Sequence, residues 1–253
     1  MRFITVGSGS RGNATLIEAG GTRVLIDCGF SARETQARLC RIGVEPATLA
    51  GIVITHEHGD HVAGVPQFAR RHRLPVWTTP GTWRAAGCPQ DVEARLFVAH
   101  GKGFRIGELR LQPFPVPHDA REPCQFVIDG DGRRLGVMTD AGTVTARARE
   151  HLQGCDALIL EANHDRHMLE TGPYPPSLRA RVGGPFGHLS NVQAAALLDG
   201  LEHRLLRHLV LAHLSAHNNR PELACAAVGS VSAALAERVS VAPQDCAGCW
   251  LDL

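Results

Sequence analysis

The sequence predicts an α+β fold in which helices cover packed β-sheets. In the first half of its 253 residues, short apolar or alternating runs are separated by glycine-rich breaks, a pattern typical of strands. In the second half, helical patterns alternate with single strands, and no shift in composition marks a linker. We therefore expect one domain over residues 1–253, because sheets and amphipathic helices bury their apolar sides against one another.

The first elements can be placed one by one. Strands are expected at 3–6, 14–18 and 23–27, with tight glycine-rich connections between them. A helix should then run from Ser31 to about Ile42, because Ser31-Ala32-Arg33-Glu34 matches a capping box in which Glu34 reaches back to the cap. The apolar run 51–55 predicts a strand that ends abruptly in a cluster of ionisable residues.

The remaining elements follow from the same patterns. The other expected strands are 75–79, Leu109–Pro115, Cys124–Asp129, Arg134–Asp140, 157–161 and 208–212, with a hairpin turn at 129–132 and short strands at the end. The other expected helices are 61–72, 143–151, further helices between 161 and 208, and 221–236.

Composition is that of a globular protein, with 44% hydrophobic and 20% charged residues. No apolar run approaches the roughly 18 residues of a membrane span, and no signal-peptide profile is present, so we expect a cytoplasmic protein without membrane contact. The eight cysteines are then expected to be reduced thiols in packing roles. A net charge of +1 supplies no long-range attraction for nucleic acid.

The densest candidate site is the run Thr55-His56-Glu57-His58-Gly59-Asp60-His61, in a chain with 14 histidines. His56 and His58 project to one side of an extended strand end, where they can chelate one metal ion. Asp60 and His61 follow the turn at Gly59 and point to a neighbouring position. A zincin HExxH motif is excluded because Asp60 stands four residues after His56. The spacing therefore predicts two adjacent half-sites for metal ions.

The H-x-H-x-D-H run resembles the signature of the metallo-β-lactamase fold superfamily of binuclear metallohydrolases. Asp27 matches the superfamily's early aspartate, His118 its third histidine, Asp140 its bridging aspartate and His213 its last ligand. Independently of this resemblance, apolar β-like runs end directly before Asp140 and His213, so that these side chains can converge at one edge of a sheet pair.

The resemblance implies a four-layer αββα sandwich with two divalent metal ions. One ion would be held by His56, His58 and His118 and the other by Asp60, His61 and His213, with Asp140 between them and Asp27 supporting the site from behind. His and Asp ligands suit Zn²⁺, Mn²⁺ and Fe²⁺ alike. Two such ions carry a charge of about +4, of which two carboxylates neutralise half, so an anionic substrate is favoured.

Two further segments are similar to motifs of the phosphodiesterase branch that contains RNase Z and the β-CASP nucleases. They are Glu161-Ala-Asn-His164, after a strand, and Gly187-His-Leu-Ser-Asn191, before a helix that Ser190 would cap. The resemblance implies a catalytic set of Asp60, Glu161 and His188, in which His188 acts at the scissile phosphate and Glu161 orients its ring. A surface strand end at Glu161 and a plain loop at His188 remain the alternatives.

The lengths of the segments between the matched residues disfavour two branches of the superfamily. Only 21 residues separate His118 from Asp140, too few for the tRNA-binding arm of RNase Z relatives, and the 72 residues between Asp140 and His213 exclude a β-CASP insertion. Residues 7–13, Gly172-Pro-Tyr-Pro175 and His213-Leu-Ser215 look like the pattern of the YycJ/WalJ-like subgroup. This resemblance implies 5′-to-3′ exonuclease activity with DNA as the nucleic acid substrate.

Other arginines and histidines carry weaker signals. Arg11 in the glycine-rich 7–13 loop is a candidate phosphate contact, with a plain β-turn as the alternative. His164 and His167, and the stretches 70–73 and 179–181, are typical of solvated helix faces. Aromatic residues make up only 5% of the chain, and no alternation of aromatic and basic residues for stacking single strands is visible.

The sequence therefore predicts a binuclear metal-dependent phosphodiester hydrolase, of the DNA exonuclease type. A small-molecule metallohydrolase that acts on a cyclic or small phosphodiester is the first alternative. A metal-free, non-catalytic binding module is the second, and the complete set of ligand-type residues argues against it.

Overall fold

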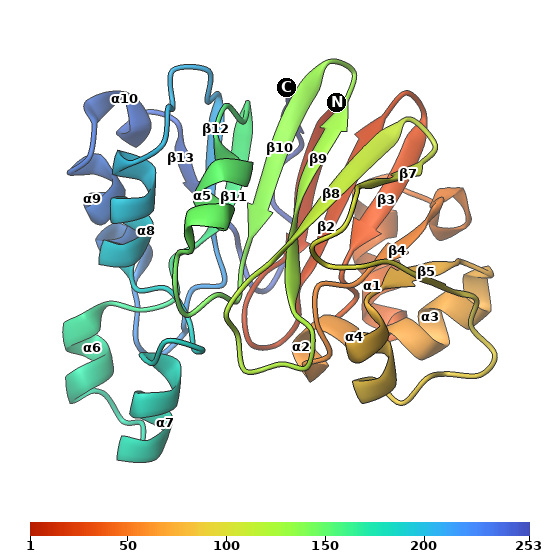
Figure 1. Cartoon of the computed structure of the whole chain (residues 1–253), viewed down its shortest axis with the longest axis horizontal. Coiled ribbons are helices and arrows are strands. Elements are labelled where there is room, and N and C mark those ends of the chain that lie inside the picture. Colours follow the sequence, from red (N-terminus) through yellow and green to blue (C-terminus); the bar gives the residue numbers. More distant parts are fainter.

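The centre of the molecule is a pair of seven-stranded sheets (Figure 1). The computed structural model describes residues 1–253. The first sheet has the strand order β14 (Leu251–Asp252), β1 (Arg2–Gly7), β2 (Ala14–Ala19), β3 (Thr22–Ile26), β4 (Gly51–Val53), β5 (Val76–Thr78) and β6 (Ala94–Leu96). The second has the order β13 (Val239–Val241), β12 (His208–Ala212), β11 (Ala157–Glu161), β10 (Arg133–Met138), β9 (Cys124–Gly130), β8 (Leu109–Pro115) and β7 (Phe104–Ile106).

Both sheets follow one plan. Antiparallel pairs come first along the chain, at β1–β2–β3 and at β7–β8–β9–β10, and parallel pairs follow, at β3–β4–β5–β6 and at β10–β11–β12–β13. Parallel neighbours require crossover connections, which explains why the helices gather late in each half. The helices are α1 (Ala32–Arg41), α2 (Gly59–Val62), α3 (Val65–His72), α4 (Pro80–Ala85), α5 (Ala146–Leu152), α6 (Arg166–Thr171), α7 (Pro176–Val182), α8 (Asn191–Asp199), α9 (Pro221–Gly229) and α10 (Ala233–Ala236), with a 3₁₀ turn at Pro46–Thr48.

Alternation along the strands creates three apolar layers. On β3, Val24 and Ile26 face the second sheet, whereas Leu25 faces Leu39 of α1 and Phe68 of α3. On β11, Ile159 faces the first sheet, and its neighbours Leu158 and Leu160 pack toward α5 and α8. Successive strand side chains point to opposite faces, so strands buried on both sides read as continuous apolar runs. The predicted four-layer αββα sandwich is confirmed.

Most expected elements are present, with local differences. The helix expected at 61–72 is two helices, because Pro66 cannot donate within a continuous helix and α3 begins anew at Val65. The helix expected at 221–236 ends at Gly229, and Ser232 caps the separate α10. Strand β6 was not expected at all. The hairpin turn at Asp131 and Gly132 is confirmed, with left-handed φ angles of 50° and 70°.

The capping box expected at the start of α1 is only half formed. The Ser31 hydroxyl accepts from the Glu34 amide at 3.2 Å, as predicted. The Glu34 carboxylate does not reach back, because it accepts instead from Nε of Arg38 at 2.7 Å, one helical turn further on. This salt bridge outcompetes the second half of the box.

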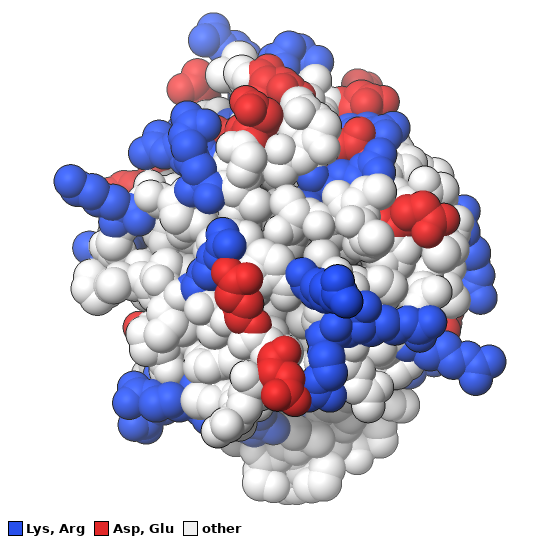
Figure 2. All heavy atoms as spheres, turned by 90° about the vertical axis from the view of Figure 1, so that its right-hand side faces the viewer, with Lys and Arg blue, Asp and Glu red and all other residues white.

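Surface features follow the charge and cysteine patterns only in part. Arg70, Arg71 and Arg73 are exposed as expected. Figure 2 shows a face of the molecule on which basic and acidic side chains are interspersed. The expectation of packing roles for the cysteines is wrong for Cys246 and Cys249, which are exposed, as is Cys40. No helix combines the length and the apolar character needed to cross a bilayer.

Candidate metal centre

The candidate ligands stand just beyond the ends of strands in both sheets. Asp27 follows β3, and the 56–61 run follows β4 and continues into α2. From the second sheet, Asp140 follows β10 and His213 follows β12 directly. Since the parallel strands of each sheet end at the same edge, residues far apart in the sequence meet there.

Three of these residues adopt a backbone conformation that favours glycine. The φ angles of Asp27, Asp140 and His213 are 60°, 50° and 55°. A left-handed residue with a side chain costs on the order of 1–3 kcal/mol and persists where the surroundings impose it. The sharp turn lets each side chain leave its strand and point across the edge of the sheets, toward the other ligands.

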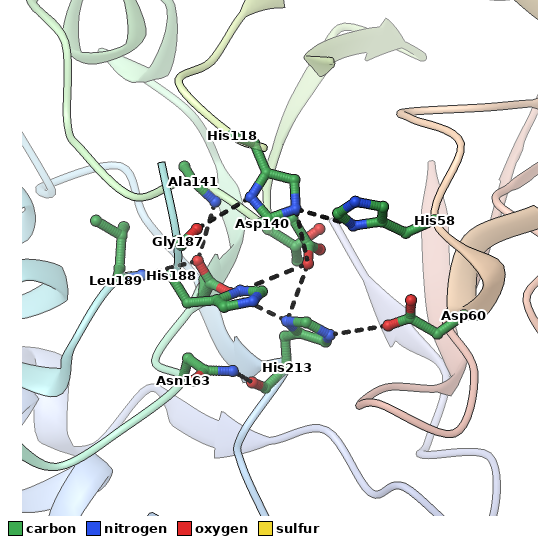
Figure 3. A network of polar contacts seen from close by, with 12 residues as sticks. His58, Asp60, His118, Asp140, Ala141, Asn163, Gly187, His188, Leu189 and His213 are labelled. Atoms are coloured by element: carbon green, nitrogen blue, oxygen red, sulfur yellow. Dashed lines mark hydrogen bonds and ion pairs between the residues drawn. The ribbon is translucent and has the colours of Figure 1, made fainter. Parts of the chain in front are cut away.

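All seven expected ligands come together, six of them in two groups of three. His56, His58 and His118 place their donor atoms within 4.8 Å of one another, and so do Asp60, His61 and His213. Asp140 lies between the groups (Figure 3), with Oδ2 3.2 Å from Nε2 of His61 and Oδ1 4.0 Å from Nε2 of His118. Asp140 is therefore in contact with residues of both groups of possible metal ligands.

Two buried atoms at the centre lack a hydrogen-bond partner within the protein. They are Nε2 of His56 and Oδ2 of Asp140, whose contact with His61 is an ion pair without hydrogen-bond geometry, and the two residues are 1% and 2% exposed. Burial lowers the pKa of His56 well below its usual range, so its ring is neutral and has a lone pair to offer. Unpaired buried polar atoms are costly unless something binds them. Neutral imidazole nitrogens beside carboxylate oxygens fit a divalent metal ion.

The carboxylates and histidines of the site shift each other's pKa values. Burial by itself would raise the pKa of Asp140, but the surrounding histidines, His213 first, hold it well below its usual range. Burial would lower the pKa of His213, yet Asp140, Asp60 and Glu161 raise it to about 10. Protons on the histidines therefore neutralise the site when no metal ion does, and a metal ion must displace them.

Asp27 supports His61 from behind. Its Oδ2 accepts from Nδ1 of His61 at 2.7 Å and from the Thr55 hydroxyl at 2.8 Å, and its Oδ1 accepts from the Thr55 amide at 2.9 Å. This fixes the His61 tautomer and leaves Nε2 facing Asp140. The position fits the supporting role that the family resemblance implied for Asp27.

Asn13 is a site residue that the sequence did not reveal. The backbone amide of Asn13 donates to the Asp60 carbonyl at 2.8 Å. The side-chain Nδ2 of Asn13 lies 3.1 Å from Nε2 of His61 and 3.3 Å from Oδ2 of Asp60. Gly29 approaches the same loop so closely that a Cβ atom there would lie 1.7 Å from the Asp60 carbonyl oxygen. Both contacts join segments that are far apart in the chain, so no local sequence pattern predicts them.

Glu161 and His188 lie beside the metal-binding residues. Oε1 of the fully buried Glu161 accepts from Nδ1 of His188 at 2.8 Å, and its Oε2 accepts from the amides of Ala141 and Leu189 at 3.1 and 3.0 Å (Figure 3). Burial would lower the pKa of His188, but the Glu161 carboxylate outweighs it and raises that pKa. The alternative of a surface strand end at Glu161 is wrong.

Three of the residues with weaker sequence signals can now be placed. His164 is 2% exposed rather than part of a solvated helix face. The Arg11 guanidinium pairs with Asp245, and Arg11 is not among the residues that line the cavity at the metal-binding group. Arg181 is exposed, as expected for a solvated helix face, and it also lines that cavity.

The comparisons with known proteins agree with this geometry. The family model described as the beta-lactamase superfamily domain matches residues 22–214. The exodeoxyribonuclease YycJ of Bacillus anthracis is 34% identical over 236 residues, which cover 91% of this chain and 89% of YycJ. The exodeoxyribonuclease WalJ of Streptococcus pneumoniae is 32% identical over 229 residues, 88% of this chain and 85% of WalJ.

A solved structure supports the fold alone. The metallo-beta-lactamase fold protein YhfI of Bacillus subtilis superimposes with a TM-score of 0.75 at 16% identity, over 99% of both chains. The chain therefore belongs to the beta-lactamase superfamily and, within it, to the YycJ/WalJ family.

Proposed function

We propose that this chain is a binuclear metal-dependent phosphodiesterase that removes nucleotides from DNA in the 5′-to-3′ direction, acting as a single domain. Membership of the family makes it a hydrolase. One observation carries the proposal: Asp140 lies between two groups of metal-type ligands, and His188, held by the buried Glu161, lines the cavity at the same place.

The distances between ligand atoms divide the residues that would hold the ions into two groups. His56, His58 and His118 would hold one ion, Asp60, His61 and His213 the other, and Asp140 would touch both. When bound, two such ions supply a nucleophilic water at neutral pH and stabilise charge on the attacking and leaving oxygens of a phosphodiester. Zn²⁺, Mn²⁺ and Fe²⁺ all suit this donor set.

His188 is the group that we assign to the leaving oxygen. Because Nδ1 donates to Glu161, Nε2 is the ring nitrogen left to face the substrate in the cavity. The Glu161 carboxylate keeps the ring oriented and raises its pKa, which favours the protonated form. A protonated His188 can stabilise the phosphoryl charge and give its proton to the departing oxygen.

DNA as the substrate is supported by the names of the two relatives that cover most of the chain. The decisive experiment is a time course on 5′-labelled and 3′-labelled DNA and RNA with Mn²⁺ or Zn²⁺ added, and with Asp60→Ala as the inactive control. We expect the 5′ label to appear in mononucleotides from the start, while 3′-labelled DNA shortens progressively.

Other outcomes would redirect the proposal. Faster cleavage of RNA would change the substrate, and immediate release of the 3′ label would reverse the polarity. Hydrolysis of bis(p-nitrophenyl) phosphate without any cleavage of nucleic acid would favour an enzyme for small phosphodiesters. Elemental analysis that finds no stoichiometric metal in active protein would overturn the binuclear centre.

A further inference from the structure

One wall of the catalytic cavity takes no part in the chemistry proposed above. The cavity has a volume of about 350 Å³, and metal-type ligands such as Asp60, Asp140 and His213 line one part of it. Tyr174, Leu178 and Arg181, from α7 and the turn before it, line another part. Figure 1 shows α6 and α7 extending beyond the edge of the sheets, where this segment can border the site.

Arg181 brings an exposed guanidinium to this wall. Its side chain is 60% exposed, and its only ion pair is between Nε and the carboxylate of Asp119. Asp119 in turn lies 3.5 Å from Nε2 of His118, so the guanidinium is tethered next to the metal-binding group. The terminal nitrogens of Arg181 make no hydrogen bond to the protein. A guanidinium held at one nitrogen can still form a fork with phosphate oxygens.

Aromatic rings lie on both sides of Arg181 in the sequence. Tyr174, the only tyrosine of the chain, lines the cavity and meets the ring of His217 edge to face, with centroids 5.9 Å apart. Phe186 is 59% exposed, and its carbonyl accepts from the Asp119 amide at 2.9 Å, which places it at the same rim as Arg181. A ring face next to a fixed cation is the combination that binds unpaired nucleotides.

We propose that the wall from Tyr174 to Phe186 binds an unpaired nucleic acid strand at its end, with Arg181 on a backbone phosphate next to the scissile one and Tyr174 stacked on a base. This inference rests on the proposed nuclease function and names its substrate as single-stranded at the site. A cavity of about 350 Å³ has the size of a small-ligand pocket and cannot enclose a base-paired duplex.

Helix α7 offers a matched control. Arg179, two residues before Arg181, lines a different cavity together with Pro176, Ala180 and Gly183, and it donates to the Glu170 carbonyl. Replacing Arg179 therefore removes the same charge from the same helix on its other side. No residue of α7 is buried, so substitutions on it spare the apolar core.

The test combines kinetics with binding on the metal-loaded protein. Steady-state rates are measured on a single-stranded DNA 10-mer, and its affinity is measured by fluorescence anisotropy in a His188→Ala background. Arg181→Ala and Tyr174→Ala should each raise KM and Kd about tenfold, with much smaller changes in kcat. Arg179→Ala should stay within about twofold of the parent in both values.

The salt dependence separates a phosphate contact from a structural role. Arg181→Ala should reduce the slope of log Kd against log salt by about 0.7, the value for one phosphate of a single strand, and Arg181→Lys should restore it. Tyr174→Ala should leave the slope unchanged. If Arg181 only positioned the His118 loop through Asp119, Arg181→Ala would lower kcat and metal content at an unaltered slope.

Two results would refute the proposal that this wall binds an unpaired strand. One is that Arg181→Ala and Arg179→Ala have the same KM and Kd. The other is that Arg181→Ala loses kcat and metal content without a change in the slope of log Kd against log salt. A parent enzyme that hydrolyses bis(p-nitrophenyl) phosphate but cleaves neither the 10-mer nor duplex DNA would refute the nuclease function itself, whereas cleavage of duplex DNA without binding of the 10-mer would refute only the binding of an unpaired strand by this wall. The behaviour of the parent thus tells the two failures apart.

Discussion

Oε1 of Glu161 lies 3.0 Å from Nδ1 of His213, inside the protein and out of contact with water. The same oxygen accepts from His188, so one carboxylate orients a metal-type ligand and the proposed general acid together. The two histidines are thereby linked through Glu161, which forms a group of possible metal ligands with Asp140, His188 and His213 but is assigned to neither ion in the proposed mechanism.

Glu161→Gln should therefore impair two properties at once. We expect turnover to fall by a factor of about 10² or more and metal affinity by about 10-fold to 100-fold, because both rings lose their charged partner. His188→Ala should lower turnover to a similar degree but leave metal affinity near that of the parent. Rates on a phosphodiester and competition with a metal chelator measure the two effects. Loss of metal in His188→Ala would show that the roles are not separable.

The metal content of single variants should report which group each residue serves. His118→Ala removes a ligand from one group only, so we expect about one ion per chain to remain after dialysis. Asp140→Ala removes the carboxylate that contacts both groups, so both ions should be weakened. Elemental analysis of matched preparations measures the difference. Equal retention of two ions in Asp140→Ala would contradict the shared position of this carboxylate.

Two glycines near Asp60 should respond in opposite ways to alanine. A methyl group at Gly29 would lie 1.7 Å from the Asp60 carbonyl oxygen and 2.8 Å from the Asn13 amide nitrogen, so the backbone of the ligand loop must move. Gly59 has open space around its Cβ position, although it belongs to the ligand run. Gly29→Ala should lose metal binding and unfold at a lower temperature, and Gly59→Ala should retain its metal. Thermal melts and metal analysis of both variants measure these effects. A Gly29→Ala variant with the unfolding temperature and metal content of the parent would refute this packing.

Stability should depend on pH through His164. Burial lowers the pKa of His164 to about 4, whereas an unfolded chain titrates near 6.5. Between these values the unfolded state binds a proton that the native state does not, so the free energy of unfolding rises with pH from about 4 to 6.5. The full contribution, on the order of 3 kcal/mol, is present above that range.

His164→Gln should flatten this part of the pH dependence relative to the parent. Urea unfolding at several pH values between 4 and 7 measures it, and the exposed His167→Gln serves as the control. Comparing variants is necessary because His213, whose pKa is raised, contributes with the opposite sign. A parallel shift of His164→Gln at all pH values would mean that the His164 ring titrates normally in the native state.

The sequence was informative wherever the physical rule is local. The period of two along β3 and β11 and the glycine-rich breaks placed the strands, and the polar residues directly after apolar runs marked strand ends. Local rules failed where a distant contact competes with them. Arg38 takes the Glu34 carboxylate from the capping box, and the surroundings of His164 bury a ring whose spacing suggested a solvated face.

By itself the sequence determined which residue types could bind metal and that several of them follow strands, because ligand chemistry and strand patterning are properties of short segments. Only the tertiary structure decided that Asn13 and Gly29 enclose the Asp60 loop, that Glu161 serves two rings, and that Arg181 faces the cavity while Arg179 does not. These relationships join segments distant along the chain, and their geometry exists only once both sheets and the helices around them are packed.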